Sequence, residues 1–134
     1  MAMDLNLISL VFVAGCVGGL ANSIAVWGMG KTGITGAMGV SVKPDWTPAW
    51  LYPRIVWGGL WGFLFLLPFL EDSIFARGII YSLGPTIVVL FIVFPLQAKK
   101  GVLGLQLGSL TPVFALIVNA AWGIAAAWWL NIAS

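Results

Sequence analysis

An arginine and two asparagines are the residues of this apolar chain best suited to bind a ligand. Arg54, Asn22 and Asn119 each lie a few residues inside a predicted membrane-spanning segment, at a similar depth. A guanidinium presents a planar fork of donors that binds two oxygens of a carboxylate or similar anion, and an asparagine amide both donates and accepts hydrogen bonds. We therefore predict a binding site for an anionic or polar group at these residues, with Ser23 and Tyr52 beside them.

Arg54 also has a purely structural interpretation. An arginine near the end of a span can extend its side chain to the membrane interface, and Pro53 beside it interrupts the first helical turns. Trp50, Trp57 and Trp61 fall on the helical face of Arg54, where a cation–π contact is worth about 0.5–2 kcal/mol. Both interpretations stay open, because an ionisable residue within a span is by default a candidate for function.

The composition of the chain places it in a membrane. Of its 134 residues, 61% are hydrophobic and only 7% are charged, whereas a soluble domain is about 25% charged. Such a composition excludes a soluble globular domain, and it excludes disorder, which requires low hydrophobicity. The net charge of +2 is too small for a nucleic-acid-binding surface. We expect membrane lipids as partners and no nucleic acid.

The residues that the chain lacks argue against an enzyme. There is no histidine and one cysteine, which excludes a histidine-ligated haem and a zinc site of Cys and His, so we expect no metal and no cofactor. Its four acids, Asp4, Asp45, Glu71 and Asp72, all lie at or beyond the ends of apolar segments. A lipid-modifying enzyme would need an interfacial carboxylate such as Asp45, or a Lys or Tyr, as its acid or base. We therefore predict no catalytic residues.

Four apolar segments are long enough to cross the hydrocarbon layer, which takes about 20 helical residues. None shows the alternation of a membrane β-strand, so helices are predicted. The fold class is therefore an all-α polytopic membrane protein, with residues 1–134 forming one transmembrane domain. The third segment should kink at Gly84–Pro85. The predicted spans are 5–29, 49–70, 78–97 and 112–132.

The cationic residues predict an orientation. Lys31 and Lys43 lie in the first loop, and Lys99 and Lys100 lie in the third connection, whereas Arg77 is the one basic residue on the opposite side. Because cytoplasmic loops are enriched in Lys and Arg, we expect both termini to lie outside the cytoplasm. The short loops favour a bacterial inner membrane as the location.

Two halves of the sequence resemble each other. Each contains a Lys-Gly loop, then Thr-Pro at a predicted helix start, then a segment that ends in Trp-Gly. This internal repeat predicts two helix–loop–helix hairpins, over about 5–70 and about 78–132. Two spans per repeat make the halves parallel, related by a pseudo-twofold axis along the membrane normal. The matching segments are 31–36, 47–48 and 58–62 in the first half, and 99–104, 111–112 and 119–123 in the second.

The loops 31–47 and 99–111 contain glycines three residues apart, such as Gly33, Gly36 and Gly39. One interpretation is a re-entrant segment that lines a polar cavity. The other is an interfacial helix whose bare glycine ridge packs on the spans. We favour the second, because non-helical backbone within a bilayer requires protein cover.

Small residues recur on the spans at the spacing that lets two helices approach closely. In lipid, helices associate by close packing and hydrogen bonds. We expect these glycines to pack the helices together and, where the stripes are exposed, to supply a dimer interface. They are Gly15, Gly19, Gly58, Gly62 and Gly123.

Two functions fit these observations. The first is an oligomeric channel or carrier for a small polar or anionic solute, with Arg54 at its inner vestibule. Because four helices seldom enclose a pore alone, this function requires a homo-oligomer. The second is a non-catalytic accessory or scaffold subunit of a larger complex, which requires a membrane protein partner.

Overall fold

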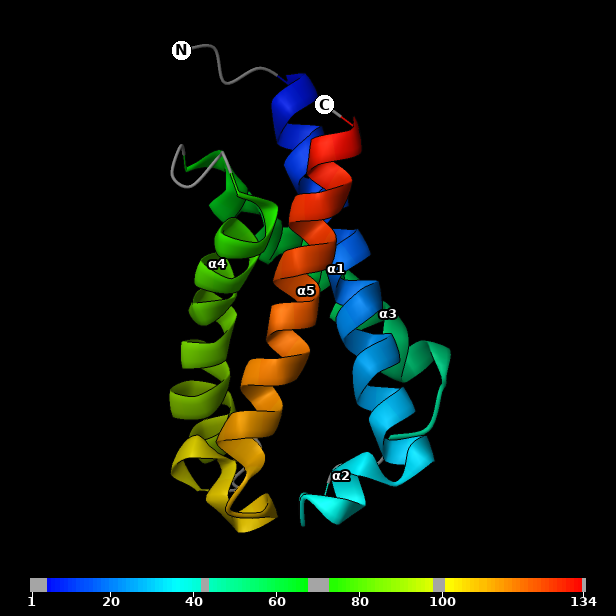
Figure 1. Cartoon of the computed structure of the whole chain (residues 1–134), viewed down its shortest axis with the longest axis vertical. Helices are drawn as coiled ribbons and strands as arrows, with labels where there is room; N and C mark the ends of the chain where they lie inside the picture. Colours follow the sequence, from blue (N-terminus) through cyan, green and yellow to red (C-terminus); the bar gives the residue numbers. More distant parts are fainter. Residues whose placement is uncertain (1–4, 42–43, 68–72, 98–100, 134) are drawn as a thin grey trace.

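The computed structural model describes residues 5–41, 44–67, 73–97 and 101–133, and the regular structure in these ranges is helical. The all-α prediction is confirmed. The start of α1 and the end of α5 lie at one end of the molecule, and α2 lies at the opposite end (Figure 1). The elements are α1 Leu5–Thr32, α2 Ile34–Ala37, α3 Pro48–Trp61, η1 Gly62–Leu66, α4 Ile74–Val88, η2 Val89–Gln97, η3 Val102–Leu107 and α5 Thr111–Ala133.

Three helical stretches in the described ranges are long and apolar enough to cross a membrane, which indicates a multi-pass membrane protein. They are Leu5–Thr32, Ile74–Leu96 and Thr111–Ala133. Some residues used to predict the orientation and the spans lie outside the described ranges: Asp4, Lys43, 68–70, Glu71, Asp72, Lys99 and Lys100.

The predicted span 49–70 is an α-helix only as far as Trp61, and it continues as the 3-10 turn η1 to Leu66. Glycine costs a helix interior about 1 kcal/mol relative to alanine, and this segment holds Gly58, Gly59 and Gly62 within five residues. A prediction from hydropathy does not include this cost of glycine, so it overestimates the length of the α-helix. In Figure 1, α3 and η1 run diagonally behind α5 and join the α2 end of the molecule to the start of α4.

The third predicted span changes from an α-helix to a π-helix shortly after Pro85. Pro85 lies inside α4, and the π-helix η2 starts at Val89, four residues later. A proline supplies no backbone N–H to the helical ladder, and Pro95 removes a second one inside η2. The wider π turn belongs to the wall of the cleft described below.

The Thr-Pro pair that starts α3 forms a regular helix cap. The hydroxyl of Thr47 accepts a 3.2 Å hydrogen bond from the Trp50 amide, and Pro48 occupies the first helical position. The second pair differs. Helix α5 does begin at Thr111, but the buried Thr111 hydroxyl has no hydrogen-bond partner in the described part of the chain. The Thr111 hydroxyl therefore does not cap α5 as the Thr47 hydroxyl caps α3.

Glycines bring the helices together in two pairs. Gly15 and Gly19 of α1 face Gly58 and Gly62 across the contact with α3; a methyl group on Gly62 would lie 2.9 Å from Gly15 Cα, and one on Gly58 would lie 2.8 Å from Gly19 Cα. In the second pair, Gly123 of α5 packs directly on the backbone of Gly78 in α4. The chain buries these glycines in its own helix contacts, so they are not exposed for a dimer interface.

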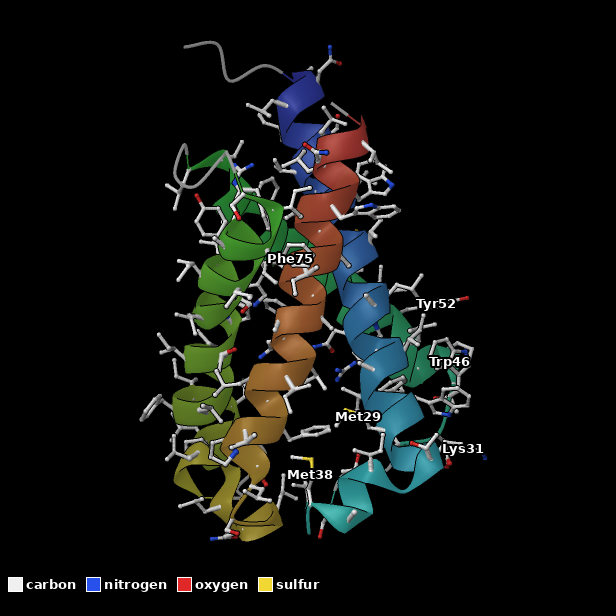
Figure 2. The ribbon with its side chains drawn as sticks, in the orientation of Figure 1. Met29, Lys31, Met38, Trp46, Tyr52 and Phe75 are labelled. Carbon is white, nitrogen blue, oxygen red and sulfur yellow. The ribbon has the colours of Figure 1, made fainter. Side chains whose placement is uncertain are left out.

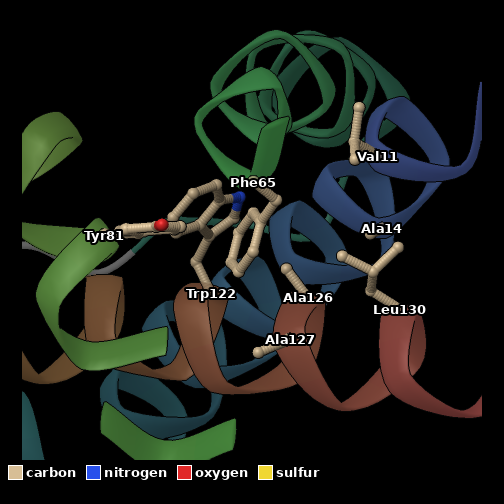
Figure 3. Packing of buried hydrophobic residues seen from close by; sticks show 8 residues of the cluster. All are labelled: Val11, Ala14, Phe65, Tyr81, Trp122, Ala126, Ala127 and Leu130. Atoms are coloured by element: carbon tan, nitrogen blue, oxygen red, sulfur yellow. The ribbon is translucent and has the colours of Figure 1, made fainter. Parts of the chain in front are cut away.

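The core at the termini end joins three helical segments through aromatic rings. Trp122 of α5 is 2% exposed, and its indole N–H donates a 3.2 Å hydrogen bond to the Gly58 carbonyl of α3. The Phe65 ring contacts Trp122 and Tyr81, with ring centroids 5.8 and 5.1 Å apart (Figure 3). Arg77 donates a 2.8 Å hydrogen bond to the Phe65 carbonyl, which ties the end of η1 to α4. The second predicted span is thereby fixed at its far end.

The two glycine-rich loops meet at the opposite end of the molecule. The Ser41 amide donates a 2.8 Å hydrogen bond to the Leu107 carbonyl. Gly33 and Gly108 have φ of 87° and 150°, a region that suits glycine, and each flanks a short helix. Both glycines make turns, so the predicted glycine ridge on a helix is wrong for Gly33.

Candidate anion-binding site

Arg54 extends its guanidinium from α3 toward α1. Its Nε donates a 3.1 Å hydrogen bond to Ser23 Oγ, and its Nη2 donates to Asn22 Oδ1. Ser23 is fully buried, and its hydroxyl donates to the Gly19 carbonyl at 2.7 Å, which fixes the oxygen that receives Nε. The Trp50 ring covers the guanidinium at 4.8 Å. These contacts hold the charged group on one side and leave the rest of the fork unused.

A chain of side-chain hydrogen bonds continues from Arg54 across the bundle. Asn22 Nδ2 donates to Asn119 Oδ1 at 3.0 Å and to the Val118 carbonyl at 2.8 Å. Asn119 Nδ2 then donates to Thr86 Oγ1 at 3.0 Å, and the Thr86 hydroxyl donates to the Ser82 carbonyl at 2.8 Å. The chain links α3, α1, α5 and α4 in one polar layer.

Every donor in this layer points away from Arg54 and every acceptor points toward it. The carbonyl oxygen of Asn22 faces the guanidinium, while its NH2 group faces Asn119. Successive bonds with one direction polarise each other. The amides therefore stabilise the cation with their dipoles, but they bring no negative charge to it.

Arg54 has no ionic partner in the part of the chain that the structure describes. Asp45 is the one acidic residue in those ranges, and it forms no ion pair with Arg54. Neutral acceptors do not cancel the charge of an arginine. Among the residues that the structure describes, the positive charge of Arg54 is therefore uncompensated.

Arg54 also faces a cleft of about 410 Å³. Asn22 and Asn119 line it together with Gly19 and Trp122. The Nη1 atom of Arg54 has no hydrogen-bond partner among the described residues and is not enclosed by protein. The remaining lining residues form two facing walls: Pro53, Trp57, Gly58 and Trp61 from α3, and Pro85, Val88, Val89, Ile92 and Val93 from α4 and η2.

The structure brings together four of the five residues predicted to form the site. Arg54, Asn22 and Asn119 line the cleft, and Ser23 is a direct partner of Arg54. Tyr52 does not join them: it is 63% exposed and points away from the bundle (Figure 2). Residues two positions apart in a helix are separated by about 200° around its axis. Tyr52 therefore lies on the face of α3 opposite to Arg54.

Sequence reasoning missed Thr86, which ends the hydrogen-bond chain. A threonine in an apolar helix often satisfies its hydroxyl on its own backbone, so its residue type gives no signal. Its depth does. Thr86 lies eleven residues before the end of η2, and Asn22 lies ten residues before the end of α1. A search for polar residues at a common depth would have included it.

Comparisons with protein-family models, with curated proteins and with solved structures found no match for this chain. Its site is therefore interpreted from its own geometry.

Proposed function

We propose that this membrane protein binds an anion at Arg54 and acts as a channel or carrier for a small polar or anionic solute. One observation carries the proposal: a largely buried guanidinium faces a cleft with no carboxylate beside it in the described ranges. A charge left uncompensated in a membrane is expensive, and a bound anion would offset that cost. The arrangement favours binding over a purely structural role.

The fork of Arg54 indicates what kind of anion fits. Nε and one N–H of Nη2 are used along one edge by Ser23 and Asn22. The end-on edge keeps the second Nη2 hydrogen and one Nη1 hydrogen, in the geometry that binds two oxygens of a planar oxyanion. A carboxylate has the planar geometry that fits this edge. Asn22 and Ser23 act as positioning residues, since they hold the opposite edge.

The proposal includes four crossings in two repeated hairpins. The path of α3 and η1 from the α2 end to the start of α4 supports a fourth crossing (Figure 1). The equivalent residues Gly62 and Gly123 each pack on a glycine of the preceding span, Gly15 and Gly78. Likewise Ser23 accepts a hydrogen bond from α3, and Thr86 accepts one from α5. These matched contacts support the repeat.

The assembly and orientation are part of the same proposal. We propose a homo-oligomer, because one bundle of four helices seldom encloses a continuous path. Lys31 lies at the α2 end of the molecule (Figure 2). This end would face the cytoplasm by the positive-inside rule, with the termini on the other side of a bacterial inner membrane.

Flux into liposomes tests this function. The full chain is reconstituted, and uptake of radiolabelled malonate, nitrate and phosphate is measured. We expect uptake of at least one of these anions above that of empty liposomes, reduced at least tenfold in Arg54→Gln and less in Arg54→Lys. Lys31→Gln is the matched control, since it removes an exposed cation outside the cleft. Uptake equal to that of empty liposomes for all three anions would overturn the transport proposal.

A scaffold subunit is the second candidate, and a groove on the outer face of α4 and α5 favours it. The groove measures about 380 Å³ and is almost entirely apolar, and Phe75 at its edge is 67% exposed (Figure 2). Small residues in such a groove let another helix approach closely. Native mass spectrometry of the protein from its own membrane would show a partner at fixed stoichiometry. The lining residues are Ile74, Phe75, Ala121, Ile124, Ala125 and Trp128.

A further inference from the structure

We infer that the ligand of Arg54 is an amphiphile, a carboxylate with a hydrocarbon tail, which enters the cleft sideways from the bilayer. The inference rests on the proposed anion binding at Arg54 and adds the class of ligand and its route. Its first support is the lining of the cleft. Beyond Arg54, Asn22 and Asn119, all of the lining residues are glycine, proline, tryptophan, valine or isoleucine.

The second support is the position of the cleft between two helix pairs. Helix α3 packs mainly on α1, and α4 packs mainly on α5, so the α3 wall and the α4–η2 wall face each other without close packing. Trp57 and Ile92, which line the cleft from the two walls, are 64% and 47% exposed. In a membrane these side chains contact acyl chains. The mouth of the cleft therefore opens to lipid.

An apolar mouth selects the form in which an anion reaches Arg54. A small hydrated anion would lose its water on passing these walls and gain no contact before it reaches Arg54. An amphiphile keeps its tail among apolar side chains throughout and desolvates only its headgroup, which Arg54 then receives. Because lipid is as apolar as these side chains, moving the tail from the bilayer into the cleft costs little, so the walls admit an amphiphile more readily than a small hydrated anion.

The depth of Arg54 matches the orientation of a lipid in one leaflet. Arg54 lies six residues after Pro48, which is about 9 Å from the loop end of α3. Trp57 and Trp61 follow by one and two helical turns, farther from that end. A carboxylate on Arg54 would thus sit nearer the lysine-bearing surface, with its tail directed along the two indoles toward the bilayer centre.

The opposite wall has a shape suited to a chain. It is made by the π-helix η2, through Val89, Ile92 and Val93. Insertions of π turns into α-helices occur frequently at functional sites, and β-branched side chains have few rotamers. The wall is therefore stiff and does not collapse into the cleft, which leaves a slot between the indoles and the aliphatic side chains.

Quenching of tryptophan fluorescence by a brominated fatty acid tests the inference. Dibromostearate is titrated into the full chain in lipid nanodiscs. We expect a saturable quenching component, at least tenfold weaker in Arg54→Gln and unchanged in Lys31→Gln. Trp57→Phe should reduce the amplitude of that component, because Trp57 lines the cleft. Dibromostearate methyl ester, which has the same tail and no charge, should give only the linear quenching of membrane partition.

A cleft-filling variant keeps the test decisive if Arg54→Gln unfolds. Val89→Phe narrows the slot from η2 and leaves the hydrogen bonds of Arg54 intact. We expect it to weaken dibromostearate binding at least tenfold with an unchanged circular dichroism spectrum and melting temperature. Full binding by a folded Val89→Phe variant would overturn the inference.

Competitors separate this inference from the proposed function. If malonate binds at Arg54 and dibromostearate shows no saturable quenching, the inference fails and anion binding stands. If brominated phosphatidylglycerol gives the saturable component and dibromostearate does not, the ligand is a phosphate-headed lipid and the carboxylate assignment fails. If neither amphiphile nor malonate depends on Arg54, the inference and the proposed function both fail.

Discussion

The side chain of Asn22 donates a 3.0 Å hydrogen bond to Asn119, and the bond joins two residues 97 positions apart in the chain. It connects the first long helix to the last at the level of Arg54. Asn22 is the central link, since its oxygen accepts from Arg54 while its NH2 group donates to Asn119 and to the Val118 carbonyl. One amide thus supports both the helix packing and the placement of the cation.

Asn22→Leu is expected to lower the free energy of unfolding by about 1–3 kcal/mol, because it leaves Arg54 Nη2 and the Asn119 oxygen without their partners in a buried site. Asn6→Leu is the matched control on the same helix, where the side chain is exposed and a change within about 0.5 kcal/mol is expected. Chemical denaturation in detergent micelles measures both. Equal effects of the two variants would contradict the role given to Asn22.

Gly123→Ala is expected to destabilise the protein by about 1–3 kcal/mol, the usual cost of overpacking. The added methyl group would meet the backbone of Gly78, which has no side chain to move aside. Gly28→Ala is the control, because Gly28 is also helical and a methyl group there meets nothing within 4 Å. It should be neutral or stabilising by up to about 1 kcal/mol. Thermal melting of the two variants in parallel decides the matter, and a neutral Gly123→Ala would refute this contact.

Hydropathy and length predict much of the helical content, because the cost of placing a polar backbone in lipid leaves helices as the solution. The first and last predicted spans correspond to α1 and α5 within a few residues. The second does not, since Gly58, Gly59 and Gly62 suit a close contact with α1 and shorten the α-helix. Which helices pack against each other depends on how their side chains fit together, and hydropathy does not predict that fit.

The candidate site was predictable in part, for a physical reason. Depth along a helix can be counted in residues, so Arg54, Asn22 and Asn119 could be placed at one level from the sequence. Rotation about the helix axis decides the rest. Tyr52 shares the depth of Arg54 and lies on another face, while Thr86 faces Asn119 although its residue type is unremarkable.

Arg54→Met separates a binding role from a structural one. If Arg54 serves to bind an anion, its charge is a cost to the empty protein. Removing that cost should offset the unpaired Asn22 Oδ1 that Arg54→Met leaves, so the free energy of unfolding should stay within about 1 kcal/mol of the wild type. Binding of dibromostearate should fall at least tenfold in the same variant. In the wild type, ligand at about a hundred times its Kd should add about 2.7 kcal/mol of stability, and Arg54→Met should lose this increment. Denaturation with and without ligand measures both quantities. A loss of more than about 2 kcal/mol without ligand would instead show that the contacts of Arg54 with Ser23, Asn22 and Trp50 hold the fold together.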